Sequence, residues 1–152
     1  MLVLGIDPGV GHTGWAVVDP KTKEVVFLGT IRLKDGPGIC RKLWEVPGPP
    51  SELLIAVQVA AEIGKPAPYF RKGRDGKAVG QMAVTKNNGL AYLIVGYLRG
   101  LGCKVVTVLP QRGKGMKMDA KTWALYWNYQ KRCSEDARDA AQIALIGAEE
   151  MR

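Results

Sequence analysis

A short apolar run at the start of the chain ends in a glycine-rich turn that carries one carboxylate, Asp7. Residues 2–6 have the composition of a buried strand, and Asp7-Pro-Gly interrupts them as a turn does. After Gly14 the chain resumes as Trp15-Ala-Val-Val, which predicts a second strand and not a helix. We therefore expect Asp7 to lie at the carboxyl end of a strand, with its partners coming from later in the chain.

The same turn has the G-x-G-x-x-G spacing of dinucleotide-binding proteins, at residues 9–14. In that fingerprint the glycines open a helix whose N-terminus receives the pyrophosphate. Because a strand is predicted to follow here, we expect no nucleotide cofactor. An actin- or Hsp70-like ATPase also begins with a strand and a phosphate-binding turn, but it needs two such lobes, and 152 residues are too few for them.

Composition and charge narrow the class of protein further. Of the 152 residues, 47% are hydrophobic and 24% are charged, so we expect one globular domain over residues 1–152. The net charge of +8 predicts a polyanionic partner, because Lys and Arg that neutralise phosphates supply most of the non-specific affinity for nucleic acids. A solvated basic surface that only maintains solubility is the alternative.

The apolar segments and the cysteines favour a cytoplasmic protein. No apolar run approaches the roughly 18 residues that a membrane span needs, so we expect no contact with a membrane. The three cysteines, Cys40, Cys103 and Cys133, are far apart and form no C-x-x-C pair. This spacing argues against a disulfide framework and against a zinc site.

The order of apolar segments predicts an α/β fold. Strands over 2–7, 14–19 and 24–33 are joined by short turns, which favours an antiparallel meander. We expect a mixed five-stranded sheet in which this three-stranded meander is followed by parallel strands, with helices on both faces. The remaining expected elements are a short helical segment at 39–45, a strand at 53–60, a long exposed loop at 61–86, a helix at 90–101, a strand at 103–109, a helix at 120–130 and a last helix capped by Ser134.

The helix expected over 90–101 is apolar on most of its sides. One face is predicted to carry Leu90, Leu93, Ile94, Tyr97 and Leu98, and the other positions are far from polar. Such a helix must be covered on both sides. We therefore expect a sheet beneath it and a second subunit above it, in a homodimer.

Four side chains are predicted to converge at the strand ends. Asp7 ends the first strand, and Gln58 stands near the end of the fourth, which is otherwise apolar. Asp136 and Asp139 lie three residues apart in the last helix and so share one face. Oxygen ligands suit Mg²⁺, and two such ions, or Mn²⁺ in their place, support phosphodiester hydrolysis. The alternatives are that Asp136 and Asp139 only interact with the helix dipole and that Asp7 only forms a turn.

Two motifs resemble those of RuvC-type Holliday junction resolvases, which have a ribonuclease H-like fold. The stretch Gly5-Ile-Asp-Pro-Gly9 with Thr13-Gly14 resembles the opening motif of that family, and Glu135-Asp-Ala-Arg-Asp-Ala-Ala141 resembles its closing helix. The length of the chain and its divergent middle look most like a bacteriophage-type member, in a bacterial cell or a phage-infected host. The resemblance implies a Mg²⁺-dependent endodeoxyribonuclease that resolves four-way junctions as a homodimer.

The resemblance also implies roles for the four side chains, with one departure. Asp7 corresponds to the carboxylate shared by two metal ions, and Asp136 and Asp139 correspond to metal ligands from the last helix. The family has a glutamate where this chain has Gln58. Glutamine keeps an oxygen ligand but lacks the negative charge, so we interpret residue 58 as an inactivating change. Glu62, four residues later, is the alternative ligand.

The basic segment over residues 65–86 is predicted to bind branched DNA. Tyr69 and Phe70 at its head are candidates to stack on bases at a branch point or wedge between them, with anchoring of the loop in the core as the alternative. His12 is a candidate to touch a phosphate or carry a proton, with an exposed turn residue as the alternative. The tryptophans are predicted to lie in the core. The candidate phosphate contacts are Arg71, Lys72, Arg74 and Lys77, and then a second basic stretch of Arg112, Lys114 and Lys117, for which a solvated loop is the alternative.

Two other functions compatible with these residues remain. A branched-DNA-binding protein without catalysis is one, because Gln58 removes a charge from the expected metal site. An rRNA-processing nuclease of the same fold is the other, although its first motif lacks the Pro-Gly and Thr-Gly pairs present here.

Overall fold

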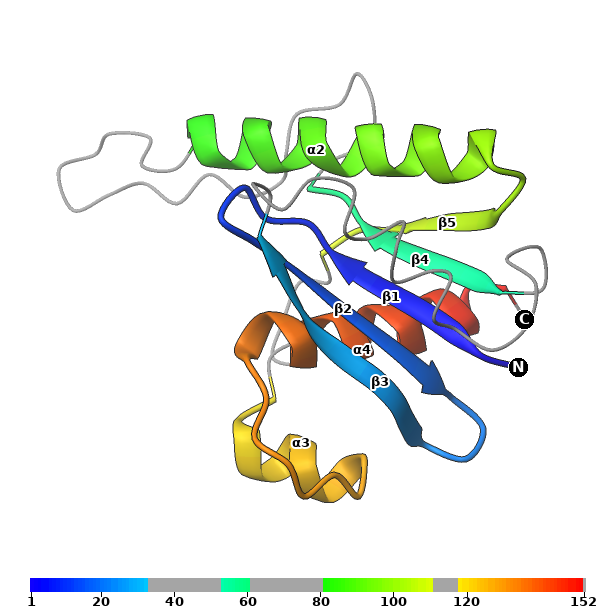
Figure 1. Ribbon diagram of the computed structural model, residues 1–152, viewed down its shortest axis with the longest axis vertical. Coiled ribbons are helices and arrows are strands. Elements are labelled where there is room, and N and C mark those ends of the chain that lie inside the picture. The colour runs from blue at the N-terminus through cyan, green and yellow to red at the C-terminus, as the bar shows by residue number, and fades with distance from the viewer. Residues whose placement is uncertain (33–52, 61–80, 111–117, 152) are drawn as a thin grey trace, which may run out of the picture.

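Five strands form one mixed sheet in the order β3-β2-β1-β4-β5 (Figure 1). The computed structural model describes residues 1–32, 53–60, 81–110 and 118–151, and the short helical segment predicted at 39–45 lies outside them. The predicted fold class is confirmed. The strands are β1 (Val3–Asp7), β2 (His12–Asp19), β3 (Glu24–Arg32), β4 (Leu54–Gln58) and β5 (Lys104–Val108).

The pairing of the strands follows from their connections. The short turns make β1, β2 and β3 an antiparallel meander, in which Asp7 pairs with Gly14. Strand β4 lies between β1 and β5 and is parallel to both. A strand in that position is buried on both faces, which explains why β4 is apolar up to its last residue, Gln58.

Three helices complete the described fold: α2 (Gln81–Gly100), α3 (Ala120–Tyr126) and α4 (Glu135–Glu149). Helix α2 covers one face of the sheet and α4 the other (Figure 1). Side chains of β1 alternate between the two faces, so that Leu4 and Ile6 pack in the α2 core and Val3 packs in the α4 core. None of the helices in the described ranges is long and apolar enough to cross a lipid bilayer.

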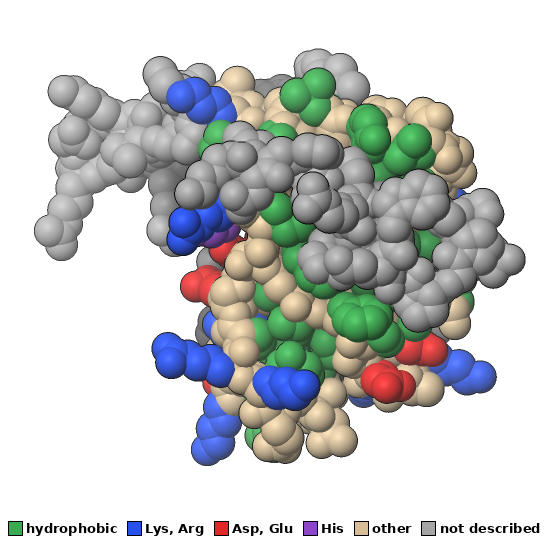
Figure 2. All heavy atoms as spheres, viewed as in Figure 1, with side chains coloured by type: hydrophobic (Ala, Val, Ile, Leu, Met, Phe, Trp, Pro, Cys, Tyr) green, Lys and Arg blue, Asp and Glu red, His purple; other side chains and the backbone are tan. Residues whose placement is uncertain are grey.

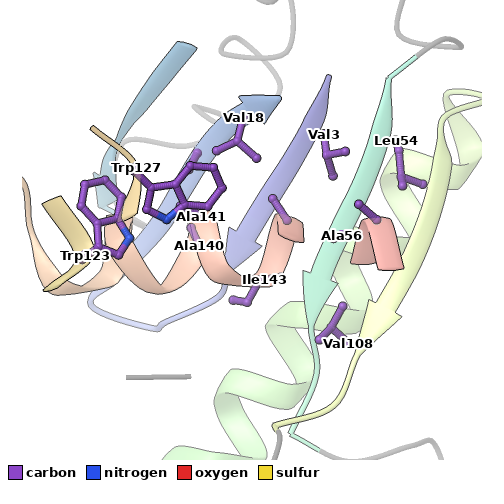
Figure 3. Close-up of a cluster of buried hydrophobic side chains, with 13 residues drawn as sticks. Val3, Val18, Leu54, Ala56, Val108, Trp123, Trp127, Ala140, Ala141 and Ile143 are labelled. Carbon is purple, nitrogen blue, oxygen red and sulfur yellow. The ribbon is translucent and has the colours of Figure 1, made fainter. Parts of the chain in front are cut away.

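The α4 core contains Trp123 of α3 and Trp127, the residue that follows this helix. Trp123 and Trp127 are almost fully buried and lie beside Ala140 and Ala141 of α4 (Figure 3). Their ring centroids are 6.3 Å apart, within the range of favourable aromatic pairs. Trp15 of β2 is buried in the opposite core, on the face of the sheet that α2 covers. The core positions predicted for these three tryptophans are therefore confirmed, and Trp44 lies outside the described residues.

Two helix boundaries differ from the prediction. Helix α2 begins at Gln81 and not at Leu90, so the last part of the expected loop is helical. The start was missed because Thr85, Asn87, Asn88 and Gly89 favour helices weakly, and packing on the sheet outweighs that preference. Helix α3 was predicted to continue to residue 130, but it ends at Tyr126, and Asn128 has the left-handed φ of 47° that turns the chain away.

The predicted face of α2 was also partly wrong. The helix buries Ala91, Val95 and Leu98 against the sheet, whereas Leu93 and Tyr97 are 73% and 53% exposed. Because the helix is apolar on most sides, hydrophobicity alone does not show which side meets the sheet.

Small residues allow α4 to lie directly against the sheet. A Cβ atom at Gly5 of β1 would overlap the carbonyl oxygen of Ala140 and would lie 2.8 Å from the amide nitrogen of Ala144. Near the other end of the helix, Gly147 lies against the methyl group of Ala56 of β4. The helix backbone therefore packs on the strands almost without intervening side chains.

We predict that Gly5→Ala lowers the free energy of unfolding by about 2 kcal/mol or more, because the helix backbone cannot yield as a flexible side chain does. Chemical denaturation measures the change. Gly11→Ala in the exposed turn is the matched control, since nothing lies within 4 Å of the added methyl group and the residue has no positive φ. There we expect a change of less than about 0.5 kcal/mol. Equal stabilities of the two variants would contradict the close packing of α4.

Candidate active site

Asp7 and Gln58 lie at the carboxyl ends of two neighbouring parallel strands. The register pairs Ile6 of β1 with Val57 of β4, so the next residue of each strand lies at the same edge of the sheet. The alternation of side chains along each strand places both residues on the face covered by α4. The predicted adjacency of the two strands is confirmed, and with it the proximity of residues 7 and 58.

The two side chains line one pocket of about 130 Å³. Its other walls come from the turn after β1, from the ends of β4 and β5, and from the first half of α2. A cavity of this size has room for several water molecules, and so for a cation that keeps part of its hydration shell. The lining residues are Asp7, Pro8, Gln58, Ala60, Asn87 and Pro110.

Hydrogen bonds hold the turn that follows Asp7. The buried Thr13 hydroxyl donates to the carbonyl oxygen of Gly9 at 3.4 Å and accepts from the amide of Gly9 at 3.5 Å. The amide of Val10 donates to Oδ1 of Asn87 at 3.0 Å, which connects the turn to α2. The turn is therefore held both by the Thr13 hydroxyl within it and by the Asn87 side chain of α2. These hydrogen bonds fix the position of the carboxyl end of β1.

The first turn of α4 begins next to the same strand ends. Ser134 caps the helix, its Oγ accepting from the amide of Ala137 at 3.2 Å, as the sequence predicts. The backbone of Asp136 lies against Gly14, the residue that pairs with Asp7 across β1 and β2. Any side chain at residue 14 would push the helix away. Glycine therefore brings the segment that carries Asp136 to the end of β1.

The structure places Asp7 and Gln58 in one pocket and Asp136 against Gly14 of the neighbouring strand, but it does not show the four predicted ligands as a metal cluster. Asp136 and Asp139 are half-buried, and neither lines the pocket with Asp7 and Gln58. Among residues 1–32, 53–60, 81–110 and 118–151, no three carboxylate, imidazole or thiol side chains are close enough to hold one metal ion. Residue 58 does not count among them because it is an amide. The role of the four residues as metal ligands stays a prediction.

The donor atoms present at the strand ends suit Mg²⁺. Asp7 offers a carboxylate, and Gln58 and Asn87 offer amide oxygens, the hard ligands that Mg²⁺ prefers over sulfur or imidazole. The residues therefore fit the predicted cofactor in chemistry. With glutamine at position 58, the site has one negative charge fewer to balance a divalent ion than it would have with glutamate.

Sequence reasoning missed Asn87 and Asn88. Asn87 lines the pocket, and Asn88 accepts from the amide of Ala60 at 2.9 Å, just beyond Gln58. A signal for them was present in the sequence. Two adjacent asparagines inside a helix are unfavourable unless their side chains have specific partners.

Of the remaining predicted site residues, the described part of the chain contains His12. It is the exposed first residue of β2, paired with Arg32 of β3. The alternative ligand and all the predicted DNA contacts lie outside the described residues, so these roles stay predictions. They are Glu62, Tyr69, Phe70, Arg71, Lys72, Arg74, Lys77, Arg112, Lys114 and Lys117.

Comparison with known proteins supports the fold. No protein-family model matches the chain, and no curated protein matches it in sequence. Among solved structures, RuvC of T. thermophilus in complex with a Holliday junction substrate matches with a TM-score of 0.65 at 17% identity, covering 99% of this chain and 96% of that one. The chain has the fold of RuvC-type resolvases.

Two further structures share this resolvase fold. Another structure of Thermus thermophilus RuvC matches with a TM-score of 0.54 at 18% identity, covering 99% of this chain and 96% of that one. The Fowlpox virus resolvase, in a complex with its substrate Holliday junction DNA, matches with a TM-score of 0.57 at 12% identity and 99% coverage of both chains. The matches span nearly the whole chain.

We predict that Ser134→Ala lowers the free energy of unfolding by about 1 kcal/mol and speeds hydrogen exchange at the Ala137 amide, which loses its capping acceptor. Denaturant titration and amide exchange by NMR measure the two effects. Ser134→Thr keeps the hydroxyl and is expected to stay close to the unchanged protein. If Ser134→Ala leaves exchange at Ala137 unchanged, the cap does not hold the first turn of α4.

Proposed function

We propose that the chain is a structure-selective DNA endonuclease that cuts four-way junctions. The observation that carries the proposal is the placement of Asp7 and Gln58 on neighbouring strand ends, with the first turn of α4 packed beside them. The same fold occurs in two resolvases whose structures contain junction DNA. The net charge of +8 agrees with a phosphate-rich substrate.

The proposed cofactor is a pair of Mg²⁺ ions, with Mn²⁺ able to substitute. Asp7, Asp136, Asp139 and the oxygen of Gln58 would hold them. When bound, such ions lower the pKa of a water molecule and neutralise charge that develops on the phosphate. The residues of the chain supply the oxygen ligands and hold the strand ends and the helix in place.

We propose that glutamine at position 58 impairs cleavage while leaving the fold and the DNA-binding surface intact. Glutamate and glutamine have nearly the same shape, but the amide contributes no negative charge to a site that must balance two divalent ions. The same residue supports a second function, binding of branched DNA without cleavage. The two functions differ in whether this chain hydrolyses a junction.

We predict that Gln58→Glu raises the rate of Mg²⁺-dependent junction cleavage by roughly 10- to 100-fold or more, because losses at metal-site residues are at least this large. A gel of an end-labelled four-way junction, with the linear duplex of one arm beside it, measures the rate in Mg²⁺ and in Mn²⁺.

Two controls accompany this experiment. Asp7→Asn in the Gln58→Glu background is expected to abolish the gain, and the duplex is expected to remain uncut. Equal cleavage by the unchanged chain and by Gln58→Glu would show that residue 58 is not a metal ligand. If both bind the junction and neither cleaves it, the binding function without catalysis is supported.

The proposed DNA contacts come from the two basic segments. Arg71, Lys72, Arg74 and Lys77 would contact phosphates beside Tyr69 and Phe70, which would stack at the branch point. Arg112, Lys114 and Lys117 would contact phosphates along a second stretch of the DNA. The support for these roles is the local excess of positive charge in the sequence.

We also propose a homodimer that uses the outer side of α2. Leu93, Tyr97 and Leu101 are spaced four residues apart, so they form one stripe, and they are 73%, 53% and 51% exposed. Figure 2 shows hydrophobic side chains along the top of the molecule, where Figure 1 places α2. A second copy of the stripe would cover it, and a two-fold symmetric dimer matches the symmetry of a four-way junction.

We predict that Leu93→Asp weakens dimerisation by roughly tenfold or more, which corresponds to about 1.4 kcal/mol, because it places an unpaired charge in an apolar contact. Sedimentation velocity at several concentrations measures the effect. The control is Leu125→Asp on α3, where the side chain is 76% exposed and away from the stripe. A chain that is already monomeric, or a dimer that both variants leave unchanged, would contradict this interface.

A further inference from the structure

Two adjacent asparagines of α2 bind the backbone just beyond the two candidate ligands. Oδ1 of Asn87 accepts from the amide of Val10 at 3.0 Å, in the turn that follows Asp7. Oδ1 of Asn88 accepts from the amide of Ala60 at 2.9 Å, two residues after Gln58. Neighbouring residues of one helix therefore hold the ends of two different strands.

The strand ends need such acceptors because the sheet no longer provides them. Strand β4 ends at Gln58, and one further backbone bond joins the amide of Val59 to the carbonyl oxygen of Val108 of β5 at 2.9 Å. Ala60 lies one residue past that bond. Backbone amides that leave a sheet must find other acceptors when water does not reach them well, and Asn88 provides one here.

Together the two hydrogen bonds hold the ends of β1 and β4 at a fixed distance from each other. Asp7 and Gln58 come from segments about fifty residues apart in sequence, and β1 and β4 pair only as far as Ile6 and Val57. Beyond that pair, the backbone on the Asp7 side is held by Asn87 and the backbone on the Gln58 side by Asn88. Because both asparagines belong to one rigid helix, a shift of one strand end relative to the other must break one of these bonds.

We propose that Asn87 and Asn88 are positioning residues that hold Asp7 and residue 58 at the separation needed to bind a divalent cation. This inference rests on the proposed nuclease function, because it takes Asp7 and residue 58 as ligands. Asn88 holds the backbone at Ala60 and does not line the pocket. Asn87 lines the pocket as well, so Asn88 provides the cleaner test.

The test uses full-length protein in the Gln58→Glu background, with and without Asn88→Leu or Asn88→Asp. Leucine has nearly the shape of asparagine but no acceptor, and aspartate restores the acceptor for the Ala60 amide. Binding of Mn²⁺ without DNA is measured by electron paramagnetic resonance, and amide exchange at Ala60 by NMR. We expect Asn88→Leu to weaken Mn²⁺ binding roughly tenfold or more and to speed exchange at Ala60, and Asn88→Asp to restore both.

Two comparisons separate positioning from general stability. Asp119→Ala removes the cap of α3, where the carboxylate accepts from the amides of Lys121 and Thr122 at 3.0 Å, and it is expected to leave Mn²⁺ binding unchanged. The double variant Asn87→Leu with Asn88→Leu is expected to weaken Mn²⁺ binding by less than the sum of the two single effects. Losing either hydrogen bond already lets the distance between the two strand ends change. Junction binding in EDTA is expected to stay the same in all variants.

The outcomes of the test are distinguishable. Unchanged Mn²⁺ affinity in Asn88→Leu, with faster exchange at Ala60, overturns the inference and leaves the proposed function standing. Failure of Asn88→Asp to restore affinity also overturns it, since the acceptor would then not be the cause. If Gln58→Glu binds no Mn²⁺ at all, the metal site itself is overturned, and this inference with it. If Gln58→Glu binds Mn²⁺ but cuts no junction, the proposed activity fails while the positioning role is still measured.

Discussion

The contact between the backbone of α4 and the strands is the constraint on which the rest of the structure depends. Gly5 and Gly14 lie directly under the helix, at Ala140 and Asp136, and Gly147 lies over Ala56. Helix and sheet approach this closely only where side chains are small. The position of α4 along the sheet is therefore fixed at three points, and the first of them is the end that carries the acidic residues. A larger side chain at Gly14 would displace that end before it disturbed the rest of the helix.

The candidate site depends on this packing from one side of the sheet and on α2 from the other. The parallel pairing of β1 and β4 brings Asp7 and Gln58 to one edge, α4 approaches them from one face, and asparagines of α2 hold the segments that follow them. Gly9, Gly14 and Thr13 of the opening turn are thus required for packing and hydrogen bonding, apart from any chemistry of Asp7. Glutamine and glutamate differ in charge and hardly in volume, so the fold accommodates either residue at position 58, whereas the proposed metal site would depend on the charge.

The sequence predicted the elements well where their pattern was local and strong. The meander, the buried strand β4 and the Ser134 cap are confirmed, because turn residues, continuous apolar runs and capping residues act within a few positions of each other. The prediction failed where two alternative local structures have similar energies. Helix α2 begins earlier than predicted because its polar first half is stabilised by contacts with distant strand ends. Its buried side carries Ala91, Val95 and Leu98, and the apolar pattern does not distinguish this side from the one with Leu93 and Tyr97. Asn87 and Asn88 were overlooked because the amides that they bind, of Val10 and Ala60, are far from them in the sequence.

The sequence by itself determined which chemical groups the protein has: one carboxylate at the end of the first strand, an amide where a fourth acidic group is expected, two aspartates on one helix face and an excess of positive charge. These follow from residue identity and short spacing. Only the tertiary structure decided which of the groups meet. Asp7 and Gln58 share a pocket with Asn87, and Asp136 lies against the neighbouring strand. The physical reason is that such distances are set by strand pairing and helix packing between segments far apart in the chain, which local pattern does not encode.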